Sequence, residues 1–162
     1  MLSQKLHDAI NEQINRELYS AYLYQAMSAH FAFESWGGFA HWMSLQAHEE
    51  QEHAERFYEY LLDRGARVTL KAIEQPPVEF GSALDIFKAS YEHEQYITAS
   101  INAIYELAVA EKDYATQQML LWFVKEQVEE EKHASEILAL LERAGDRIHA
   151  LMALDHQLAQ RS

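Results

Sequence analysis

Residues 48–53 read HEEQEH, six polar or charged side chains in a row that include no lysine or arginine. The residues around them keep helical spacing, since Met43, Glu50 and Phe57 are seven positions apart. Seven residues make two helical turns, so Glu50 falls on the stripe that should be the buried face of a helix. His53 follows one turn later. A carboxylate and an imidazole at positions where leucine would fold better indicate a functional site.

The composition indicates a globular, helical protein. Its 162 residues suffice for one domain with a proper core, and 49% hydrophobic with 24% charged residues is typical of a folded chain. Only two prolines and five glycines interrupt it, which leaves long segments free to form helices. We expect residues 1–162 to form a single domain.

Charge and cysteine content exclude several classes of function. A formal net charge of −13 argues against nucleic acid or an anionic membrane as partner. The chain has no cysteine, which excludes disulfides, thiolate metal sites and iron–sulfur clusters. The first residues, MLSQKLHDAI, lack the apolar core of a signal peptide, and no stretch approaches the length of a membrane span. A cytoplasmic location is expected.

The helical period predicts four long helices and one short one. Gly65 should end the second helix in a left-handed conformation, Ser82 and Asp85 resemble a capping box, and Asp113 is the expected N-cap of the fourth helix. The expected helices cover about residues 3–33, 38–64, 82–112, 113–145 and 147–160, with the bundle spanning 3–145.

The connections between these helices predict the topology. Residues 66–81 form a loop of 16 residues, whereas the first and fourth helices are joined to their neighbours by only a few residues. Near full extension the loop could span about 50 Å, against about 42 Å for a helix of about 28 residues. It can therefore run the length of a bundle and make the second and third helices parallel. The sequence predicts an all-α four-helix bundle with one long crossover loop and a short C-terminal fifth helix.

Every long helix carries one glutamate on its apolar stripe. In the first helix Ile10, Glu17 and Tyr24 are seven apart, and Glu94 and Glu130 hold equivalent positions in the third and fourth helices. Any one of them can be read as a partly exposed residue at the edge of the stripe, but four near mid-bundle are harder to explain in that way. Burying an unpaired carboxylate costs several kcal/mol, and no stripe lysine or arginine is available as a partner.

Two divalent cations would balance this charge. Four carboxylates supply −4 and two metal ions +4, and neutral His53 adds a nitrogen ligand from the same helical face as Glu50. Oxygen-rich ligation with one imidazole suits iron or manganese. Carboxylate-bridged di-iron bundles are built in this way, with one glutamate from each of two helices and Glu-x-x-His from each of the other two.

With these residues in place, the whole chain resembles a bacterial non-haem ferritin. The resemblance implies a ferritin-like fold and an iron-storage protein that oxidises Fe(II) with O2 or hydrogen peroxide at a di-iron centre. It implies that Glu17, Glu50 and His53 hold the first iron, and that Glu94 and Glu130 hold the second, with Glu50 bridging.

The fourth helix departs from the di-iron enzyme pattern. In EQVEEE, residues 126–131, Gln127 occupies the place of the second pattern's glutamate and Glu130 the place of its histidine. A second site with fewer ligands binds iron more loosely, which suits iron as a substrate that must leave.

Further residues take roles from the same resemblance. Glu49, Glu126 and Glu129 match the carboxylates that form a third iron site with Glu130, although they also read as a solvated acidic face. Tyr24 and Trp122 match aromatics near the centre. Tyr24 could hydrogen-bond a ligand carboxylate or donate an electron, and core packing is the alternative for both.

The resemblance also bears on haem and assembly. Gln51 stands where bacterioferritins use a methionine to bind haem, so no haem is expected. The final helix resembles the one that lines the four-fold axis of ferritin shells, which implies a cage of 24 subunits. Gln117 and Leu120 align with the carboxylates that line the entry channel of animal ferritins, which places that route of iron uptake in doubt.

Three other functions are alternatives that the sequence favours less. One is a di-metal redox enzyme of the same fold, such as a manganese catalase or a rubrerythrin-like peroxidase. Another is a DNA-protecting mini-ferritin, and the last is a non-enzymatic bundle with solvated glutamates. The remaining histidines read as surface or packing residues, among them His7, His30, His41, His93, His133, His149 and His156.

Overall fold

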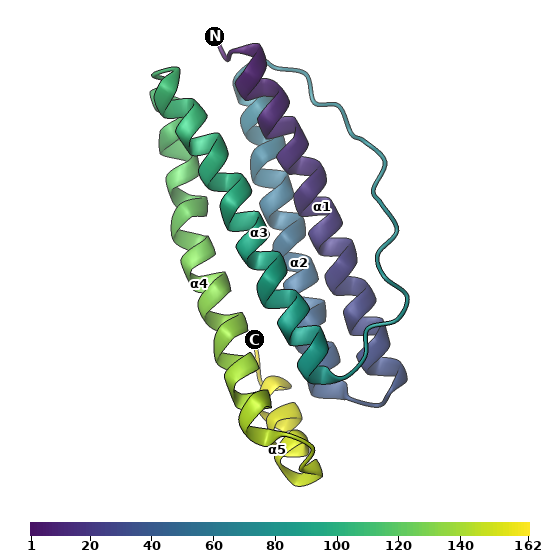
Figure 1. Ribbon diagram of the computed structural model, residues 1–162. Helices are drawn as coiled ribbons and strands as arrows, with labels where there is room; N and C mark the ends of the chain where they lie inside the picture. Colours follow the sequence, from purple (N-terminus) through teal and green to yellow (C-terminus); the bar gives the residue numbers. More distant parts are fainter.

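The computed structural model describes residues 1–162 and contains five α-helices and no strand, which confirms the expected fold class (Figure 1). The helix ends differ from the expected ones by no more than two residues. The helices are α1 (Gln4–Phe33), α2 (Gly37–Asp63), α3 (Ala83–Ala110), α4 (Tyr114–Ala144) and α5 (Ile148–Leu158).

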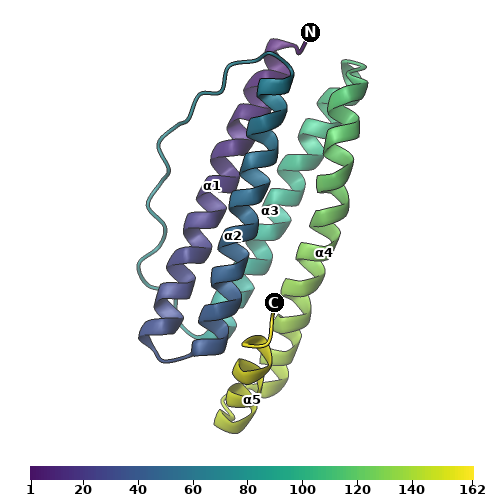
Figure 2. The same ribbon diagram turned by 180° about the vertical axis from the view of Figure 1, so that it is seen from behind.

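The crossover loop runs along the outside of the bundle beside α1, from one end to the other (Figures 1 and 2). As a result α2 and α3 point in the same direction, and the pairs α1–α2 and α3–α4 are antiparallel. Side-chain amides tie the loop to α1, because Asn11 donates to the carbonyl of Thr69 (2.8 Å) and Asn15 to that of Ala72 (3.2 Å).

Local signals define the helix ends. Ser82 and Asp85 form the complete capping box at the start of α3, and the Asp113 carboxylate accepts from the backbone N–H of Thr116 at the start of α4. Gly65 adopts a φ of +68° after α2, a conformation that glycine takes without the steric cost of a side chain.

The start of α2 has a cap that comes from elsewhere in the chain. Trp36, at the N-cap position, makes no side-chain capping hydrogen bond. Instead the Asp155 carboxylate of α5 accepts from the backbone N–H of Phe39 at 2.9 Å. Gly38 permits this approach, because a Cβ at that position would lie 1.7 Å from the carbonyl oxygen of Asp155. Helix α5 is thus seated on the first turn of α2.

Two apolar clusters form the core, and a layer of buried polar residues divides them. One cluster joins the α1–α2 turn to α5 and includes Phe31, Phe39 and Leu154. The other fills the opposite end around Phe57 and Phe123, whose rings stack at 4.0 Å. The polar and charged residues buried in the bundle are Asn11, Gln13, Glu17, Ser20, Gln46, Glu50, His53, Ser90, Glu94, Thr116, Gln127 and Glu130.

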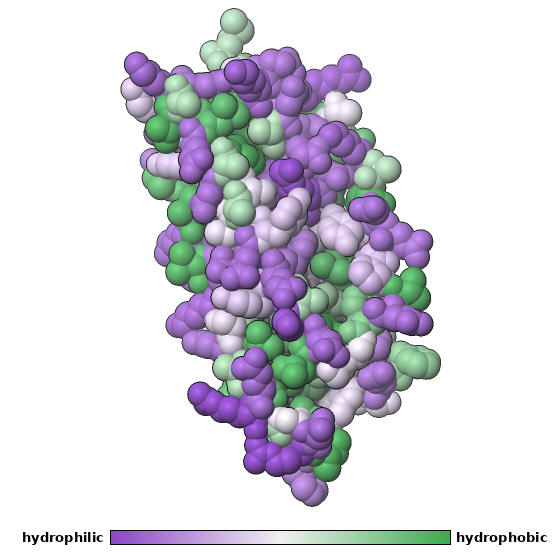
Figure 3. All heavy atoms as spheres, in the orientation of Figure 1, coloured by the Kyte–Doolittle hydropathy of each residue, from purple (hydrophilic) through white to green (hydrophobic).

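The outer surface carries scattered apolar groups. On the face that Figure 3 draws, they form separate patches among hydrophilic residues. None of the helices combines the length and hydrophobicity that crossing a membrane requires.

Candidate metal centre

The polar layer brings together the four stripe glutamates, one from each long helix. Glu17, Glu50, Glu94 and Glu130 are each no more than 4% exposed, and His53 is 3% exposed. The four carboxylates have no lysine or arginine partner, because their only ion-pair contact joins Glu50 to His53. The fold therefore buries four acidic groups at the centre of the bundle without a resident positive charge to balance them.

One side of the layer is formed by Glu17, Glu50 and His53. A ligand atom from each of these residues lies within 4.8 Å of the others, so one cation could contact all three. Nδ1 of His53 lies 3.2 Å from Glu50 Oε2. Gln13 donates to Glu17 Oε1 at 2.8 Å, while Glu17 Oε2 is buried and has no hydrogen-bond partner. An unpartnered buried carboxylate oxygen is the kind of atom that a cation would satisfy.

Hydrogen bonds hold Glu94 on the other side of the layer. The Tyr24 hydroxyl donates to Glu94 Oε1 and lies 3.1 Å from the Ser90 hydroxyl. The amide of Gln127 donates to Glu94 Oε2 at 3.1 Å, and its own Oε1 is buried without a partner. Tyr24 therefore hydrogen-bonds a predicted ligand and is also fully buried, whereas electron donation by this residue stays a prediction. These donors fix the Glu94 carboxylate in one orientation.

Glu130 belongs to a second group of close ligand atoms. One atom each from His53, Glu126 and Glu130 lies within 4.8 Å of the others. The amide of Gln46 donates to Glu130 Oε2 at 2.6 Å. His53 is common to both groups, so it lies close to Glu17 and Glu50 as well as to Glu126 and Glu130.

The remaining predicted residues lie at the edge of the layer. Glu126 is half-buried and Glu129 is exposed, both on α4. Glu49 is half-buried on α2 and its Oε2 accepts from Arg161 at 2.7 Å. Trp122 packs edge-on against the His53 ring, with centroids 5.5 Å apart. Glu49 therefore differs from the other acidic residues of the site, because a basic side chain holds it.

Burial raises the pKa of every carboxyl group in the layer. It raises the pKa of Glu94 to about 7 and that of Glu130 to about 8. The pKa values of Glu17 and Glu50 are raised well above the ordinary range, first by burial and then by the charge of neighbouring carboxylates. A bound cation would act in the opposite direction and favour the ionised forms.

Three supporting residues were not anticipated from the sequence, although a signal for them exists. Gln13, Gln46 and Ser90 each stand four positions before a stripe glutamate, so each lies one turn away on the same helical face. A polar residue at that spacing is a second departure from the apolar stripe. Arg161 gave no such signal, because it reaches Glu49 from 112 residues away.

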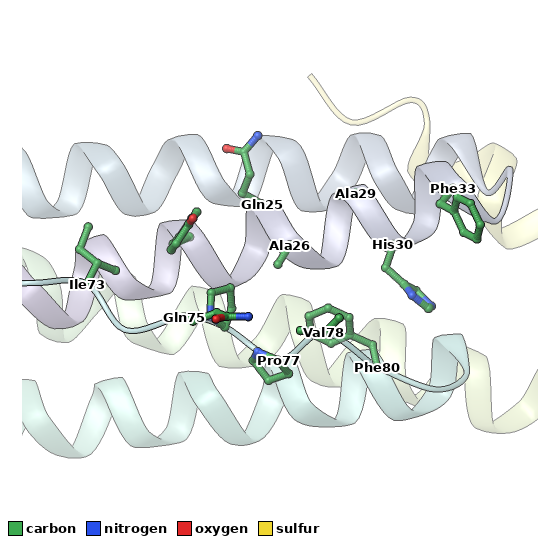
Figure 4. A pocket seen from close by; sticks show the side chains of 12 residues that line it. Gln25, Ala26, Ala29, His30, Phe33, Ile73, Gln75, Pro77, Val78 and Phe80 are labelled. Atoms are coloured by element: carbon green, nitrogen blue, oxygen red, sulfur yellow. The ribbon is translucent and has the colours of Figure 1, made fainter.

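A surface pocket of about 760 Å³ lies apart from this layer, between α1 and the crossover loop (Figure 4). Its lining is largely apolar and includes Tyr22, Phe33, Ile73, Val78 and Phe80. It contains no carboxylate. The pocket therefore plays no part in the metal centre, and its exposed apolar side chains are suited to contact with another protein surface.

A four-helix bundle with a long crossover and four buried glutamates at its centre defines the class of ferritin-like carboxylate proteins. The sequence profile of the ferritin-like domain matches residues 7–144. The chain is 43% identical over 161 residues to a bacterial non-haem ferritin of Bacteroides fragilis, covering 99% of this chain and 100% of the relative. It is 40% identical over 162 residues to one of Staphylococcus aureus, covering 100% and 98%.

The backbone of the chain also superposes closely on solved ferritins. An open-pore ferritin from the hyperthermophilic archaeon Archaeoglobus fulgidus superposes with a TM-score of 0.99 at 43% identity, over 100% of this chain and 99% of the other. This match includes the crossover loop and α5. The chain belongs to the ferritin family.

Proposed function

We propose that this chain oxidises Fe(II) at the buried carboxylate layer and stores the ferric product as a hydrated oxide inside a shell of 24 copies. The observation that carries the proposal is the burial of four glutamates in one layer with no basic partner. Iron is the substrate, and the protein supplies ligands, orientation and negative charge.

The two sides of the layer would each receive one iron. Glu17, Glu50 and His53 bind the first, and Glu94 and Glu130 bind the second, with Glu50 as the bridge. The two ions each give one electron, and O2 or hydrogen peroxide accepts the pair. The negative charge of the ligands favours Fe(III) over Fe(II), and Gln127, an amide in place of a carboxylate, leaves the second iron less tightly held.

A third iron site at the edge of the layer would serve transit. Glu49, Glu126 and Glu129 join Glu130 there, and the closeness of Glu126 to Glu130 and His53 supports such a site. We propose that the chain uses no haem, because the exposed Gln51 stands at the position of the haem-binding methionine, and that it acts in the cytoplasm.

Exposed apolar side chains support assembly of the shell. Phe33 is 90% exposed and Val78 is 76% exposed beside the pocket of Figure 4. Ile148 and Met152 are exposed on α5. Side chains of this kind gain free energy when another copy covers them.

Two alanine variants test the assignment of the centre. Glu17→Ala and Glu130→Ala should each slow the rapid phase of Fe(II) oxidation about tenfold or more, because each removes a direct ligand. Neither should unfold the bundle, since each removes a buried carboxyl group that has no basic partner. Stopped-flow absorbance measures the rate, and Glu142→Ala, which removes an exposed glutamate on α4, is the matched control. Wild-type rates in both ligand variants would refute the assignment.

A further inference from the structure

Arg161, the penultimate residue, lies against the face of α2 that carries the metal centre. One nitrogen, Nη1, donates to the carbonyl of Trp42 at 3.2 Å and to Gln46 Oε1 at 3.1 Å. The other, Nη2, donates to Glu49 Oε2 at 2.7 Å. Residues 42, 46 and 49 are four and three positions apart, so they line one stripe of α2. The guanidinium thus spans this stripe at the edge of the carboxylate layer.

The fold fixes the end of the chain in this place. Leu158 is buried in the apolar cluster beneath α5, and His41 Nε2 lies 2.7 Å from the carbonyl oxygen of Arg161. The guanidinium stacks over the Trp42 ring at 4.6 Å, and the Arg161 side chain is only 19% exposed. These contacts hold the positive charge of Arg161 beside the metal centre, while the side chain stays partly exposed to solvent.

Glu49 is therefore already paired when a metal ion reaches the edge of the layer. Among the carboxylates of the proposed third site, Glu126 and Glu130 lie close to His53 and are free of basic partners. Glu49 is the member that a basic side chain holds. A metal ion can gain Glu49 as a ligand only if the carboxylate leaves the guanidinium, since the two cations compete for the same oxygen.

We propose that Arg161 is a resident competitor for the third iron site: it holds Glu49 and thereby keeps the third iron weakly bound and able to move on. This inference rests on the third site of the proposed function. It adds that the docked C-terminus, and not only the acidic residues, sets how tightly that site holds iron.

Arg161 also orients the amide of Gln46. A guanidinium only donates hydrogen bonds, so its contact with Gln46 Oε1 turns Nε2 of the same amide toward Glu130. Arg161 is consequently a positioning residue for Glu130 as well as the partner of Glu49. Loss of the guanidinium is expected to change both contacts, which the experiment must separate.

Anaerobic titration of the assembled, metal-free protein with Fe(II) tests the proposal, with calorimetry as the readout. Arg161→Gln should bind the third ion per chain about two- to five-fold more tightly than the wild type, the range expected for a partly exposed ion pair. Arg143→Gln, which removes the same charge from an exposed site on α4, is the matched control and should bind as the wild type does. Arg161→Lys, which keeps the charge but not the fork, should give an intermediate affinity.

A double variant separates the effect on Glu49 from that on Gln46. If Glu49 is the competed ligand, Glu49→Gln should weaken binding of the third ion more strongly in the Arg161→Gln background than in the wild-type background. Equal or weaker binding of the third ion in Arg161→Gln, or equal effects of Glu49→Gln in both backgrounds, would overturn the proposal. Failure of the wild type to bind its first two ions would instead refute the proposed function.

Discussion

At the residue scale, the buried glutamates share one property: burial changes the pH at which they lose their protons. In an unfolded chain a glutamate titrates near pH 4.3, whereas burial in this bundle raises the pKa of Glu94 to about 7 and that of Glu130 to about 8. Between the pKa of the unfolded chain and these raised pKa values, the folded protein binds more protons than the unfolded chain. Stability without metal therefore falls as pH rises through this window.

The stability of the metal-free protein should therefore depend on pH. The metal-free protein should lose several kcal/mol of unfolding free energy between about pH 5 and pH 8, because its buried carboxyl groups ionise without partners. Denaturant unfolding at a series of pH values measures the loss, and saturating Zn(II), which is not oxidised, should reverse it. Glu130→Gln should flatten the pH dependence, whereas the exposed Glu142→Gln should not. A stability that rises over this range would contradict the assigned protonation.

At the scale of elements, α5 caps the start of α2 and packs against its first turn. The Asp155 carboxylate satisfies the N–H of Phe39, and its backbone carbonyl lies against Gly38. The chain beyond α5 then brings Arg161 to Glu49. The seating of one short helix therefore completes the start of α2 and places a charge beside the metal centre.

Substitution of the two adjacent glycines tests this seating. Gly38→Ala should destabilise the protein by about 1–3 kcal/mol, because the new Cβ would collide with the Asp155 carbonyl and push α5 away. Gly37→Ala is the matched control: its Cβ would meet nothing within 4 Å, so it should be neutral or slightly stabilising. Hydrogen exchange of residues 148–158 reports on docking. Equal exchange in both variants would show that Gly38 does not seat α5.

The elements themselves follow from local sequence. Helical spacing, the Ser82–Asp85 box and the left-handed Gly65 all act over a few residues, so the helices and their ends could be predicted. The parallel placement of α2 and α3 followed from the length of one loop. The cap that Asp155 gives to α2 could not be predicted, because it depends on how a distant helix docks.

The candidate site also contains residues that could be predicted from local sequence and contacts that could not. The stripe glutamates and His53 could be identified because each interrupts an apolar period within its own helix. Which oxygen each donor contacts could not, since Gln46 bonds Glu130 on another helix and not Glu50 on its own. Arg161 was beyond prediction because nothing local relates it to Glu49.

The whole molecule is an apolar bundle interrupted at its centre by one acidic layer. The two apolar clusters on either side supply the stability that lets the layer remain buried without metal. Leu120, which we expect to align with a channel carboxylate of animal ferritins, is fully buried in one of these clusters. This position therefore offers no ligand for iron uptake, and Gln117 beside it donates to the Ala108 carbonyl.

The central claim is that iron is both oxidised at the layer and retained by the assembly. Fe(II) is added aerobically and in large excess to the metal-free protein, and oxidation is followed together with the iron that stays soluble with the protein. The account predicts a fast phase of about two Fe(II) per chain, followed by retention of on the order of hundreds of ferric ions per assembly. Retention that stops at about two ions per chain would contradict storage and indicate a di-iron enzyme without a mineral cavity.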